Sequence, residues 1–288
     1  MITSTLMGGL GNQLFQIFAT IAYAIRCRHK FIFPYCELLN GITTRGTYWE
    51  TFLSSLKIFT TYNTKYGLTN DSLNTFPEIR IPFHNYQEIP MIDSSKSVKL
   101  FGYFQSYKYF EKEEETIFSL IRIDQQLSQV KKENKILFEK NKYNISMHFR
   151  LGDYKFLQES HNLLPYHYYE LALHTITEKL PNENINIFVF GEAQDNETIL
   201  AMVEQLKQQY PLIYFIKIDD NIPDWKQLLL MACCESNIIA NSSFSWWGAY
   251  FNKNKEKIVC YPSVWFGPCL SHNYMGDMFP DSWTRISI

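Results

Sequence analysis

The chain has 288 residues, a length typical of about two domains. Lys and Arg number 27 against 29 Asp and Glu, a formal net charge of -2, and 46% of the residues are hydrophobic. This apolar content and small net charge exclude a disordered chain. Because no basic excess is present to neutralise a phosphate backbone, nucleic acid is excluded as the main partner.

The most apolar segment near the N-terminus, residues 14–25, is interrupted by Gln16 and Thr20. It has about half of the roughly 20 residues that a membrane-spanning helix needs. Neither a preceding basic segment nor a following cleavage site marks it as a signal peptide. The six cysteines form no C-x-x-C pair, which disfavours a zinc site and a disulfide framework. We expect a soluble, cytoplasmic protein with no transmembrane segment.

In the first half of the chain, the hydrophobic pattern predicts helices and strands that begin with one βαβ unit. The predicted elements are strands at 2–7, 31–33 and 98–105, and helices at 12–26, 111–123 and 127–142. Residues 40–97 are rich in polar residues and contain Pro77, Pro82 and Pro90. That composition predicts short helices and loops.

From residue 144 onward, predicted strands alternate regularly with predicted helices. The strands are at 145–150, 185–190, 212–218, 237–240 and 257–261. The helices are at 165–180, 196–210, 224–235 and 244–252. Such alternation indicates a parallel sheet with helices on both faces. We therefore predict an α/β protein of two lobes, residues 1–143 and 144–288, which meet between residues 124 and 144.

Three motifs follow predicted strands, at the carboxyl ends where open parallel sheets bind their ligands. The first motif is GGLGNQ at residues 8–13. Its glycines, Gly9 and Gly11 among them, allow a ligand to approach the backbone, and the free amides of the next helix can face an anion. Leu14 occupies the third glycine position of G-x-G-x-x-G, so this is not the dinucleotide fingerprint. The alternative is an ordinary tight turn.

The second motif is HFRLGDY at residues 148–154. His148 and Arg150 are two residues apart on a predicted strand, so their side chains share one face. Arg150 offers a planar, permanently charged fork that suits a phosphate. Gly152 is expected to turn the chain and bring Asp153 near the same place. The alternative is an Arg–Asp pair that only fastens a loop.

The third motif, NSSFSWWG at residues 241–248, joins a predicted strand to a helix. Hydroxyl groups and free amides at a helix N-terminus can hold a phosphate. Ordinary N-capping is the alternative, and it accounts for one serine rather than for the whole cluster. We assign Trp246 and Trp247 to the hydrophobic core rather than to a sugar-binding surface.

Motifs for other chemistries are missing from the sequence. It has no D-x-D triplet in a loop after a strand, which a metal-dependent nucleotide-sugar enzyme uses to hold Mn²⁺ or Mg²⁺. It also has no G-x-S-x-G and no G-x-x-x-x-G-K-[ST]. We expect neither a metal nor a cofactor. The charge of a departing diphosphate must then be met by Arg, hydroxyl and amide groups.

Together, the motifs resemble those of the bacterial α1,2-fucosyltransferases of glycosyltransferase family 11, and the likeness runs nearly from end to end. Its landmarks are GGLGNQLFQ at 8–16, GYFQSYKYF at 102–110, HFRLGDY at 148–154, the Tyr168-Tyr169 helix, LMACCESNIIANSSFSWWGAY at 230–250, and a tail with Tyr261-Pro262, Trp265-Phe266 and residues 280–283. Only residues 40–97 lack such landmarks.

The resemblance implies a GT-B-like architecture, in which two Rossmann-like lobes face a cleft. It implies that the N-terminal lobe is on the acceptor side and that the C-terminal lobe binds GDP-fucose, which is a donor substrate and not a cofactor. The implied reaction is inverting, metal-independent transfer of L-fucose from GDP-β-L-fucose to the 2-hydroxyl of a galactose-terminated glycan.

Residue roles follow from the motifs and from a more distant similarity to α1,6- and protein O-fucosyltransferases. In those enzymes the first Arg of H-x-R meets the donor phosphate, and the Asn of the G-N-Q turn lies near the reacting centre. The residues expected to be catalytic are Arg150, Asp153 and Asn12. The residues expected to bind substrate are Gly9, Gly11, Gln13, His148, Glu192, Asp224, Gln227, Asn241, Ser242, Ser243, Phe244 and Ser245. As general base, Asp153 is the first candidate and Glu192 the second, although Asp153 could instead only orient Arg150 or His148.

Three positions depart from the family pattern. Leu151 stands where a second Arg is usual, although the protein O-fucosyltransferases also have an aliphatic residue there. Gly191-Glu192-Ala193 replaces a Ser-Asp-Asp type of loop. Gln227 replaces an Asp that is expected to contact guanine, and Asp224, one turn earlier, could compensate.

The residues leave three other functions open. One is GDP-fucose-dependent transfer to a different hydroxyl or acceptor. Another is a catalytically silent protein that binds a sugar nucleotide or a glycan, which the three departures would fit. A nicotinamide oxidoreductase is the third, and the incomplete glycine fingerprint disfavours it.

Overall fold

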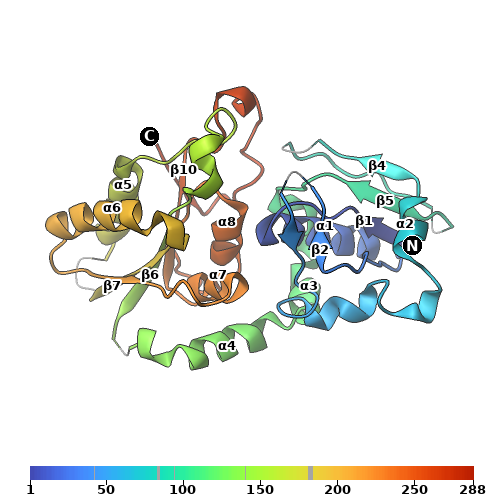
Figure 1. Ribbon diagram of the computed structural model, residues 1–288, viewed down its shortest axis with the longest axis horizontal. Helices are drawn as coiled ribbons and strands as arrows, with labels where there is room; N and C mark the ends of the chain where they lie inside the picture. The colour runs from blue at the N-terminus through green and yellow to red at the C-terminus, as the bar shows by residue number, and fades with distance from the viewer. Residues whose placement is uncertain (42, 83–84, 94, 140, 181–183) are drawn as a thin grey trace. The chain divides into compact units, whose positions relative to one another are not determined.

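The computed structural model describes residues 1–41, 43–82, 85–93, 95–139, 141–180 and 184–288. These residues form two compact units, and the chain divides between them after Asp124. The first unit is Met1–Asp124 with Asn273–Pro280, and the second is Gln125–His272 with Asp281–Ile288. Each unit contains a parallel sheet with helices packed on it (Figure 1), so the predicted α/β class is confirmed.

The first unit centres on a three-stranded parallel sheet in the order β1-β5-β4. Its strands are β1 (Ile2–Ser4), β5 (Val98–Phe101) and β4 (Glu78–Arg80). Helix α1 (Leu10–Arg26) packs on β1 and buries most of its length. The strands predicted at 2–7 and 98–105 and the helix predicted at 12–26 are therefore confirmed, with the strands shorter than expected.

The prediction of a strand at 31–33 is wrong. These residues form only two isolated parallel bridges, one to Ile2 and one to Thr60. Pro34 follows directly and has no N–H group with which to continue a ladder. Strand β4 was not predicted, because its three residues lie within the polar, proline-containing stretch 40–97.

Short elements fill the rest of the first unit. They are β2 (Leu38–Leu39), β3 (Arg45–Gly46), the 3-10 helices η1 (Ser54–Phe59) and η2 (Thr64–Tyr66), and α2 (Asn70–Asn74). The short helices predicted within 40–97 are present, and the two two-residue strands were not predicted. The two helices expected next are present in shorter form, as α3 (Glu114–Leu120) and α4 (Ile123–Glu133). Among the described residues, no helix has both the length and the apolar character needed to cross a membrane.

The second unit contains a six-stranded sheet in the order β11-β10-β9-β6-β7-β8, in which every neighbouring pair is parallel. Its strands are β6 (Tyr143–His148), β7 (Ile185–Phe190), β8 (Tyr214–Lys217), β9 (Ser236–Ile238), β10 (Val259–Pro262) and β11 (Thr284–Ile286). Its helices are α5 (Tyr166–Thr177), α6 (Asn196–Gln209), α7 (Asp224–Ala232) and α8 (Ser243–Tyr250). Every element predicted after residue 144 is present, and β11 is an addition.

The strand order defines where this sheet can bind a ligand. Figure 1 shows α5 and α6 on one face of the sheet and α7 and α8 on the other. Numbered along the chain, the strands lie in the doubly wound order 3-2-1-4-5-6, which reverses direction between β6 and β9. At such a reversal a crevice forms outside the carboxyl ends of the strands, and open α/β sheets bind their ligands there.

The core of the second unit holds these strand ends in place. β7 is buried at every position and β6 at every position but Tyr143, as expected for central strands of a parallel sheet covered on both faces. Ile145 pairs with Ile187 across the two strands, and Leu173 of α5 and Val203 of α6 belong to the same apolar cluster. A rigid apolar core thus lies under the polar residues that follow β6 and β7.

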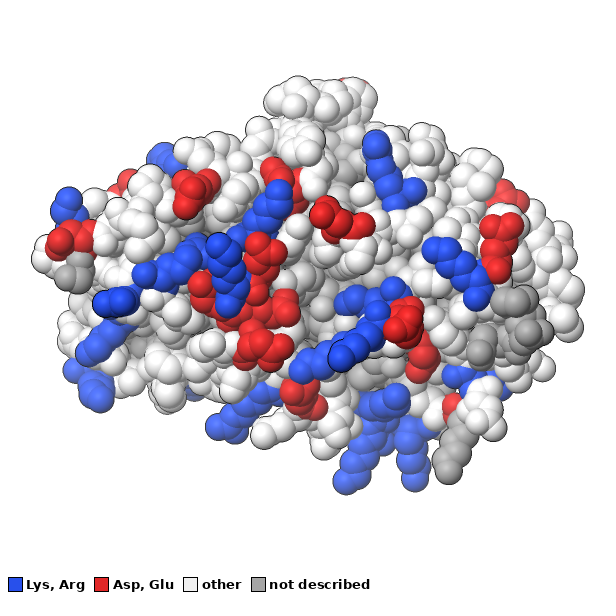
Figure 2. Space-filling model, turned by 180° about the vertical axis from the view of Figure 1, so that it is seen from behind, with Lys and Arg blue, Asp and Glu red and all other residues white. Residues whose placement is uncertain are grey.

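Charged side chains of both signs are mixed over the surface. On the face seen in Figure 2, Lys and Arg side chains are interspersed with those of Asp and Glu. The pair formed by Lys226 Nζ and Glu133 Oε2, 2.7 Å apart, joins α7 to α4 within the second unit. Charges of opposite sign therefore lie close together on this surface rather than in separate patches.

Candidate active site

Two of the predicted motifs meet at the switch point of the second sheet. β6 and β9 are neighbours, with Met147 paired to Ile238. Beyond their carboxyl ends come residues 148–154 and 241–245, which are HFRLGDY and NSSFS. The topology therefore brings together two segments that are about 90 residues apart in the sequence, at the place where this class of sheet binds ligands.

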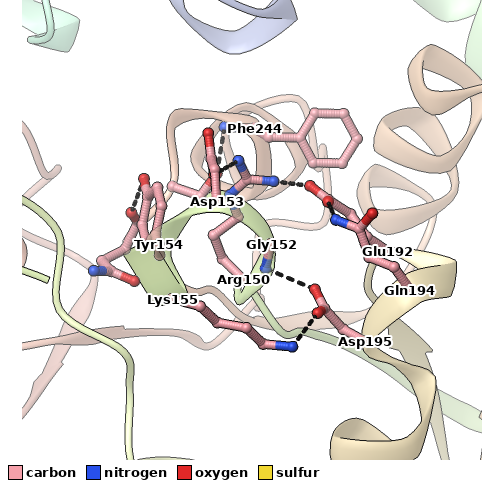
Figure 3. Close-up of polar contacts among 11 residues, drawn as sticks. Arg150, Gly152, Asp153, Tyr154, Lys155, Glu192, Gln194, Asp195 and Phe244 are labelled. Carbon is pink, nitrogen blue, oxygen red and sulfur yellow. Dashed lines mark hydrogen bonds and ion pairs between the residues drawn. The ribbon is translucent and has the colours of Figure 1, made fainter. Parts of the chain in front are cut away.

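Arg150 is at the centre of the site. Figure 3 shows its guanidinium between the carboxylates of Asp153 and Glu192, with an ion pair to each. The guanidinium also lies over the Tyr154 ring, 5.0 Å from its centre. The Arg150 side chain is 19% exposed, against 43% for Asp153 and 44% for Glu192. An anion that binds this arginine must compete with two carboxylates.

The Arg–Asp pair that the sequence offered as an alternative is thus present, and Glu192 is its second partner. Glu192 follows β7, the strand next to β6, and Gln194 Nε2 donates to its Oε2 at 2.7 Å. Both residues that were expected to act as general base are therefore bound to Arg150. This arrangement orients the guanidinium, as was considered for Asp153.

Gly152 allows the loop after β6 to turn tightly beside Glu192. Its φ is +37°, and a Cβ atom at this position would lie 2.7 Å from Glu192 Oε2. Its N–H donates to buried Asp195 Oδ2 at 2.7 Å, and Lys155 Nζ donates to Asp195 Oδ1 at 2.7 Å. Asp195 and Lys155 had no predicted role. They fasten this loop to η7 (Ala193–Asp195), directly before α6.

His148 is buried at the end of β6, with 7% of its surface exposed. Burial, with a smaller contribution from the charge of Arg150, lowers the pKa of His148 to about 3. The imidazole is therefore neutral at pH 7. Its Nδ1 has no hydrogen-bond partner within the described part of the chain, and its ring lies 5.6 Å from that of Phe244. A neutral ring with a free nitrogen can exchange one hydrogen bond with a ligand.

The residues at the start of α8 differ in burial and in the hydrogen bonds that they make. Ser242 is the N-cap, because its Oγ accepts a hydrogen bond from Phe244 N at 3.3 Å. Ser245 is buried, and its Oγ lies within 3.5 Å of the Ala240 carbonyl oxygen. Ser243 and Phe244 are half-buried, so they supply the accessible surface of this helix N-terminus. Capping thus accounts for Ser242, and the helix end remains able to face an anion.

Asn241 ties the end of β9 to two loops. Its Nδ2 donates to the carbonyl oxygens of Asn162 at 2.9 Å and Trp265 at 3.0 Å. Its own carbonyl oxygen accepts from Tyr154 Oη at 3.2 Å. Asn241 is 1% exposed, so the visible role of its side chain is to hold the loops around the site. Contact with a substrate remains a prediction.

Asp224 and Gln227 lie in the first turn of α7. This helix follows the edge strand β8, whereas Arg150 follows β6, two strands away. Asp224 is exposed, and Gln227 Nε2 donates to the carbonyl oxygen of Ile222 at 2.8 Å. The Gln227 amide therefore closes its own turn. The structure places these two residues at a different point of the carboxyl edge from Arg150.

The glycine turn belongs to the first unit, where it meets a second family motif. Asn12 is on the first turns of α1, and its Oδ1 accepts from Gln105 Nε2 at 2.9 Å. Gln105 comes shortly after β5, which pairs with β1. Phe104 has a φ of +53°, so the backbone turns sharply next to Gln105. Gln105 was quoted as part of GYFQSYKYF but had no predicted role, and its position after a strand was the available signal.

The other predicted residues of this turn differ in exposure. Gln13 is buried, and its Nε2 donates to the carbonyl oxygens of Gly8 at 3.0 Å and Gly46 at 2.9 Å. Gly11 is also buried, whereas Gly9 is the N-cap of α1 and has open space where a side chain would stand. Gln13 therefore holds the turn together, and Gly9 leaves room beside the backbone.

We expect Gly8→Ala to lower the free energy of unfolding of the first unit by about 1–3 kcal/mol. Gly8 has a φ of +76°, and an added Cβ atom would lie 2.6 Å from Asn12 Nδ2. Gly9→Ala is the matched control, since Gly9 has a φ of -76° and free space, and we expect it to change stability by roughly 0.5 kcal/mol or less. Denaturant unfolding measures both variants. Equal stability of the two would contradict a required left-handed turn at Gly8.

Possible metal ligands are not clustered in the part of the chain that the structure describes. No group of three or more His, Cys, Asp or Glu side chains that could hold a metal ion is found there. The charged groups that the site offers to a ligand are those of the Arg150 cluster, together with the helix N-terminus of α8.

Comparisons with known proteins extend over the whole chain. Residues 1–284 match the model of glycosyl transferase family 11. The O-antigen biosynthesis glycosyltransferase WbnK of Escherichia coli is 27% identical over 317 aligned positions, 98% of this chain and 99% of that protein. The alpha-1,2-colitosyltransferase of Escherichia coli is 27% identical over 306 positions, 99% of this chain and 98% of that protein. The NodZ alpha-1,6-fucosyltransferase of Bradyrhizobium, crystallised with GDP, is 12% identical with a TM-score of 0.46, covering 86% of this chain and 91% of that one.

The fold and the site define a class of protein. A parallel α/β sheet presents an arginine fork and a helix N-terminus at its switch point, and both groups are chemically suited to phosphate. The family match makes this more specific. The chain belongs to glycosyltransferase family 11, and it is a glycosyltransferase. The family suggested by the sequence motifs is confirmed.

Proposed function

We propose that the protein transfers L-fucose from GDP-β-L-fucose to the 2-hydroxyl of a galactose-terminated glycan, with inversion and without a metal. The observation that carries this proposal is the position of Arg150 at the β6–β9 switch point, where α8 also begins. Family membership supports glycosyl transfer, and a relative with α1,2 in its name supports the linkage.

In the proposed reaction, the acceptor oxygen attacks the anomeric carbon of fucose directly. A new C–O bond forms on one face while the bond to the phosphate oxygen breaks on the other, so GDP leaves with the electron pair. Arg150 and the backbone amides of Ser243 and Phe244 stabilise the charge that grows on that oxygen. Preorganised donors of this kind are commonly the largest single contribution to catalysis. Asp153 and Glu192 hold the guanidinium until the diphosphate replaces one of them.

We propose the donor for the second unit and the acceptor for the first. His148, with its free Nδ1, and the α8 N-terminus suit the nucleotide side. In the first unit, Gln105 fixes the amide of Asn12, and a fixed amide can bind a sugar hydroxyl. Residues 40–97, which lack family landmarks, are proposed to shape the acceptor site. The six cysteines are free thiols, which fits a cytoplasmic location.

The test is a transfer assay with GDP-fucose and a panel of galactose-terminated acceptors, with and without EDTA. We expect mass spectrometry to show addition of one fucose and linkage analysis to place it on the 2-hydroxyl. Activity should be the same in EDTA. Loss of activity in EDTA would contradict metal-free transfer. Transfer to another hydroxyl would identify a fucosyltransferase of a different linkage.

A second candidate is transfer of colitose, because the chain is 27% identical to the alpha-1,2-colitosyltransferase over 99% of its length. The same panel run with the GDP-activated form of each sugar decides between the donors. A higher kcat/KM with colitose would favour this candidate. Binding of GDP-fucose without transfer or hydrolysis would identify a catalytically silent protein.

A further inference from the structure

Direct displacement at the fucose carbon leaves one proton on the acceptor oxygen, and a nearby base must take it. The two carboxylates first considered, those of Asp153 and Glu192, are both ion-paired with Arg150. Their lone pairs serve to hold a permanent cation. A base that is free of such partners fits the task better, because it must approach the acceptor hydroxyl to about 3 Å.

His161 lies beside this cluster on the loop between η6 (Gly152–Phe156) and α5. Its ring is stacked on the ring of Tyr154, with centres 4.4 Å apart and an angle of 11° between planes. The guanidinium of Arg150 is 5.0 Å from the centre of the same Tyr154 ring. A single tyrosine thus links the imidazole to the arginine.

The loop that carries His161 is fixed in place by its neighbour Asn162. Asn162 Nδ2 donates to the carbonyl oxygen of Phe266 at 3.0 Å, and the Asn162 carbonyl oxygen accepts from Asn241 Nδ2 at 2.9 Å. Asn241 begins one of the two motifs at the switch point, and its carbonyl oxygen binds Tyr154 Oη. The imidazole is therefore held near the same strand ends as Arg150, although His161 lies outside the three sequence motifs.

The ring of His161 is free for chemistry. It is half-buried, and within the described residues its ring nitrogens make no hydrogen bond. The charged groups that face it are Arg150 and Asp153, and the rings that touch it are those of Tyr154 and Phe266. Burial lowers the pKa of His161 below its usual value of 6.5; Asp153 acts in the opposite direction, and Arg150 adds to the lowering. The ring is thus neutral at pH 7 and able to accept a proton.

We propose that His161 is the general base of the transfer reaction, an inference that rests on the proposed function. A ring nitrogen of His161 takes the hydroxyl proton of the acceptor as the oxygen forms its bond to the anomeric carbon. The electron pair of the broken C–O bond leaves with GDP, so the step ends with imidazolium, GDP and the fucosylated glycan. The imidazolium then releases its proton to solvent. Arg150 and His161 thereby serve the leaving group and the nucleophile, respectively.

The test compares His161→Gln with the wild type. We expect kcat to fall about 10²–10⁴-fold, while the Kd for GDP changes less than about twofold. In the wild type, kcat/KM should fall as pH decreases through the pKa of His161, below 6.5, because the protonated ring cannot act as a base. That acid limb should be missing in the variant. His174→Gln is the control, since His174 lies exposed on α5, where its Nε2 is 3.1 Å from Glu178 Oε1.

Two results would overturn the proposal. One is a His161→Gln enzyme with the kcat and pH profile of the wild type, in an assay where the wild type transfers fucose. The other is a His161→Gln enzyme whose loss of kcat is matched by an equal loss of affinity for GDP, which would show that the ring only supports the donor site. If the wild type transfers no fucose from GDP-fucose, the proposed function fails and the base assignment fails with it, whereas an active wild type with an unimpaired His161→Gln variant overturns the base assignment alone.

Discussion

Replacing Arg150 by lysine lowers kcat/KM for fucosyl transfer by about 10²–10³-fold, the usual effect of losing one group that stabilises a developing anion. Lysine keeps the positive charge but is a single rotatable ammonium, whereas arginine presents two parallel N–H groups to a phosphate. In the structure those groups face Asp153 and Glu192, so the fork is already oriented. Steady-state kinetics with varied GDP-fucose measures the effect.

The control must separate a role in catalysis from a role in fastening the loop. Arg285→Lys alters an exposed arginine of β11 in the same unit, where one guanidinium nitrogen donates to the Ser263 carbonyl oxygen at 3.3 Å, and it should retain full activity. Arg150→Ala should be at least as inactive as Arg150→Lys while its unfolding midpoint stays near that of the wild type. Near-normal turnover of a folded Arg150→Ala protein would refute the assignment.

Trp246→Ala lowers the free energy of unfolding of the second unit by about 3–5 kcal/mol, the range for removing a large aromatic side chain from a core. Trp246 is 0% exposed and stacks on Tyr250 with ring centres 4.6 Å apart. It also contacts Trp247 at 5.1 Å and Trp283 at 5.5 Å. The prediction that both tryptophans of the motif belong to the core is thus confirmed, because Trp247 is fully buried too.

Denaturant unfolding of the second unit measures this effect, and Phe156→Ala is a matched control. Phe156 is also aromatic but is 86% exposed in η6, so its loss should change stability by roughly 0.5 kcal/mol or less. Equal effects of the two substitutions would show that the cluster around Trp246 is not packed as described. A Trp246→Ala protein that stays folded should still bind GDP, because the ring does not reach the surface.

The regular second half of the chain was readable because its signals are local. The run INIFVF at 185–190 is apolar except for Asn186, and it forms β7 within those bounds. Buried strands and helices of 8 to 14 residues each have a recognisable hydrophobic pattern, so the α/β class followed without tertiary information. The motifs HFRLGDY and NSSFSWWG likewise lay where polar residues follow such strands.

The irregular first half was less readable for a related physical reason. Strand β4 has only three residues, and its alternation of exposed and half-buried positions is too short to stand out. Residues 31–33 have a strand-like composition but make two bridges, since Pro34 ends the ladder. In this region, strand pairing depends on which segments lie next to each other in three dimensions. A local sequence pattern does not contain that information.

The sequence by itself determined the family and the α/β class, because both depend on residues that are close together along the chain, and it singled out Arg150 as a candidate catalytic residue. Only the tertiary structure decided which groups surround that arginine. Glu192 meets Arg150 across 42 positions, Gln105 meets Asn12 across 93, and Asn241 meets Tyr154 across 87. Such contacts arise from the strand order of the sheets, which aligns the carboxyl ends of strands that are far apart in sequence.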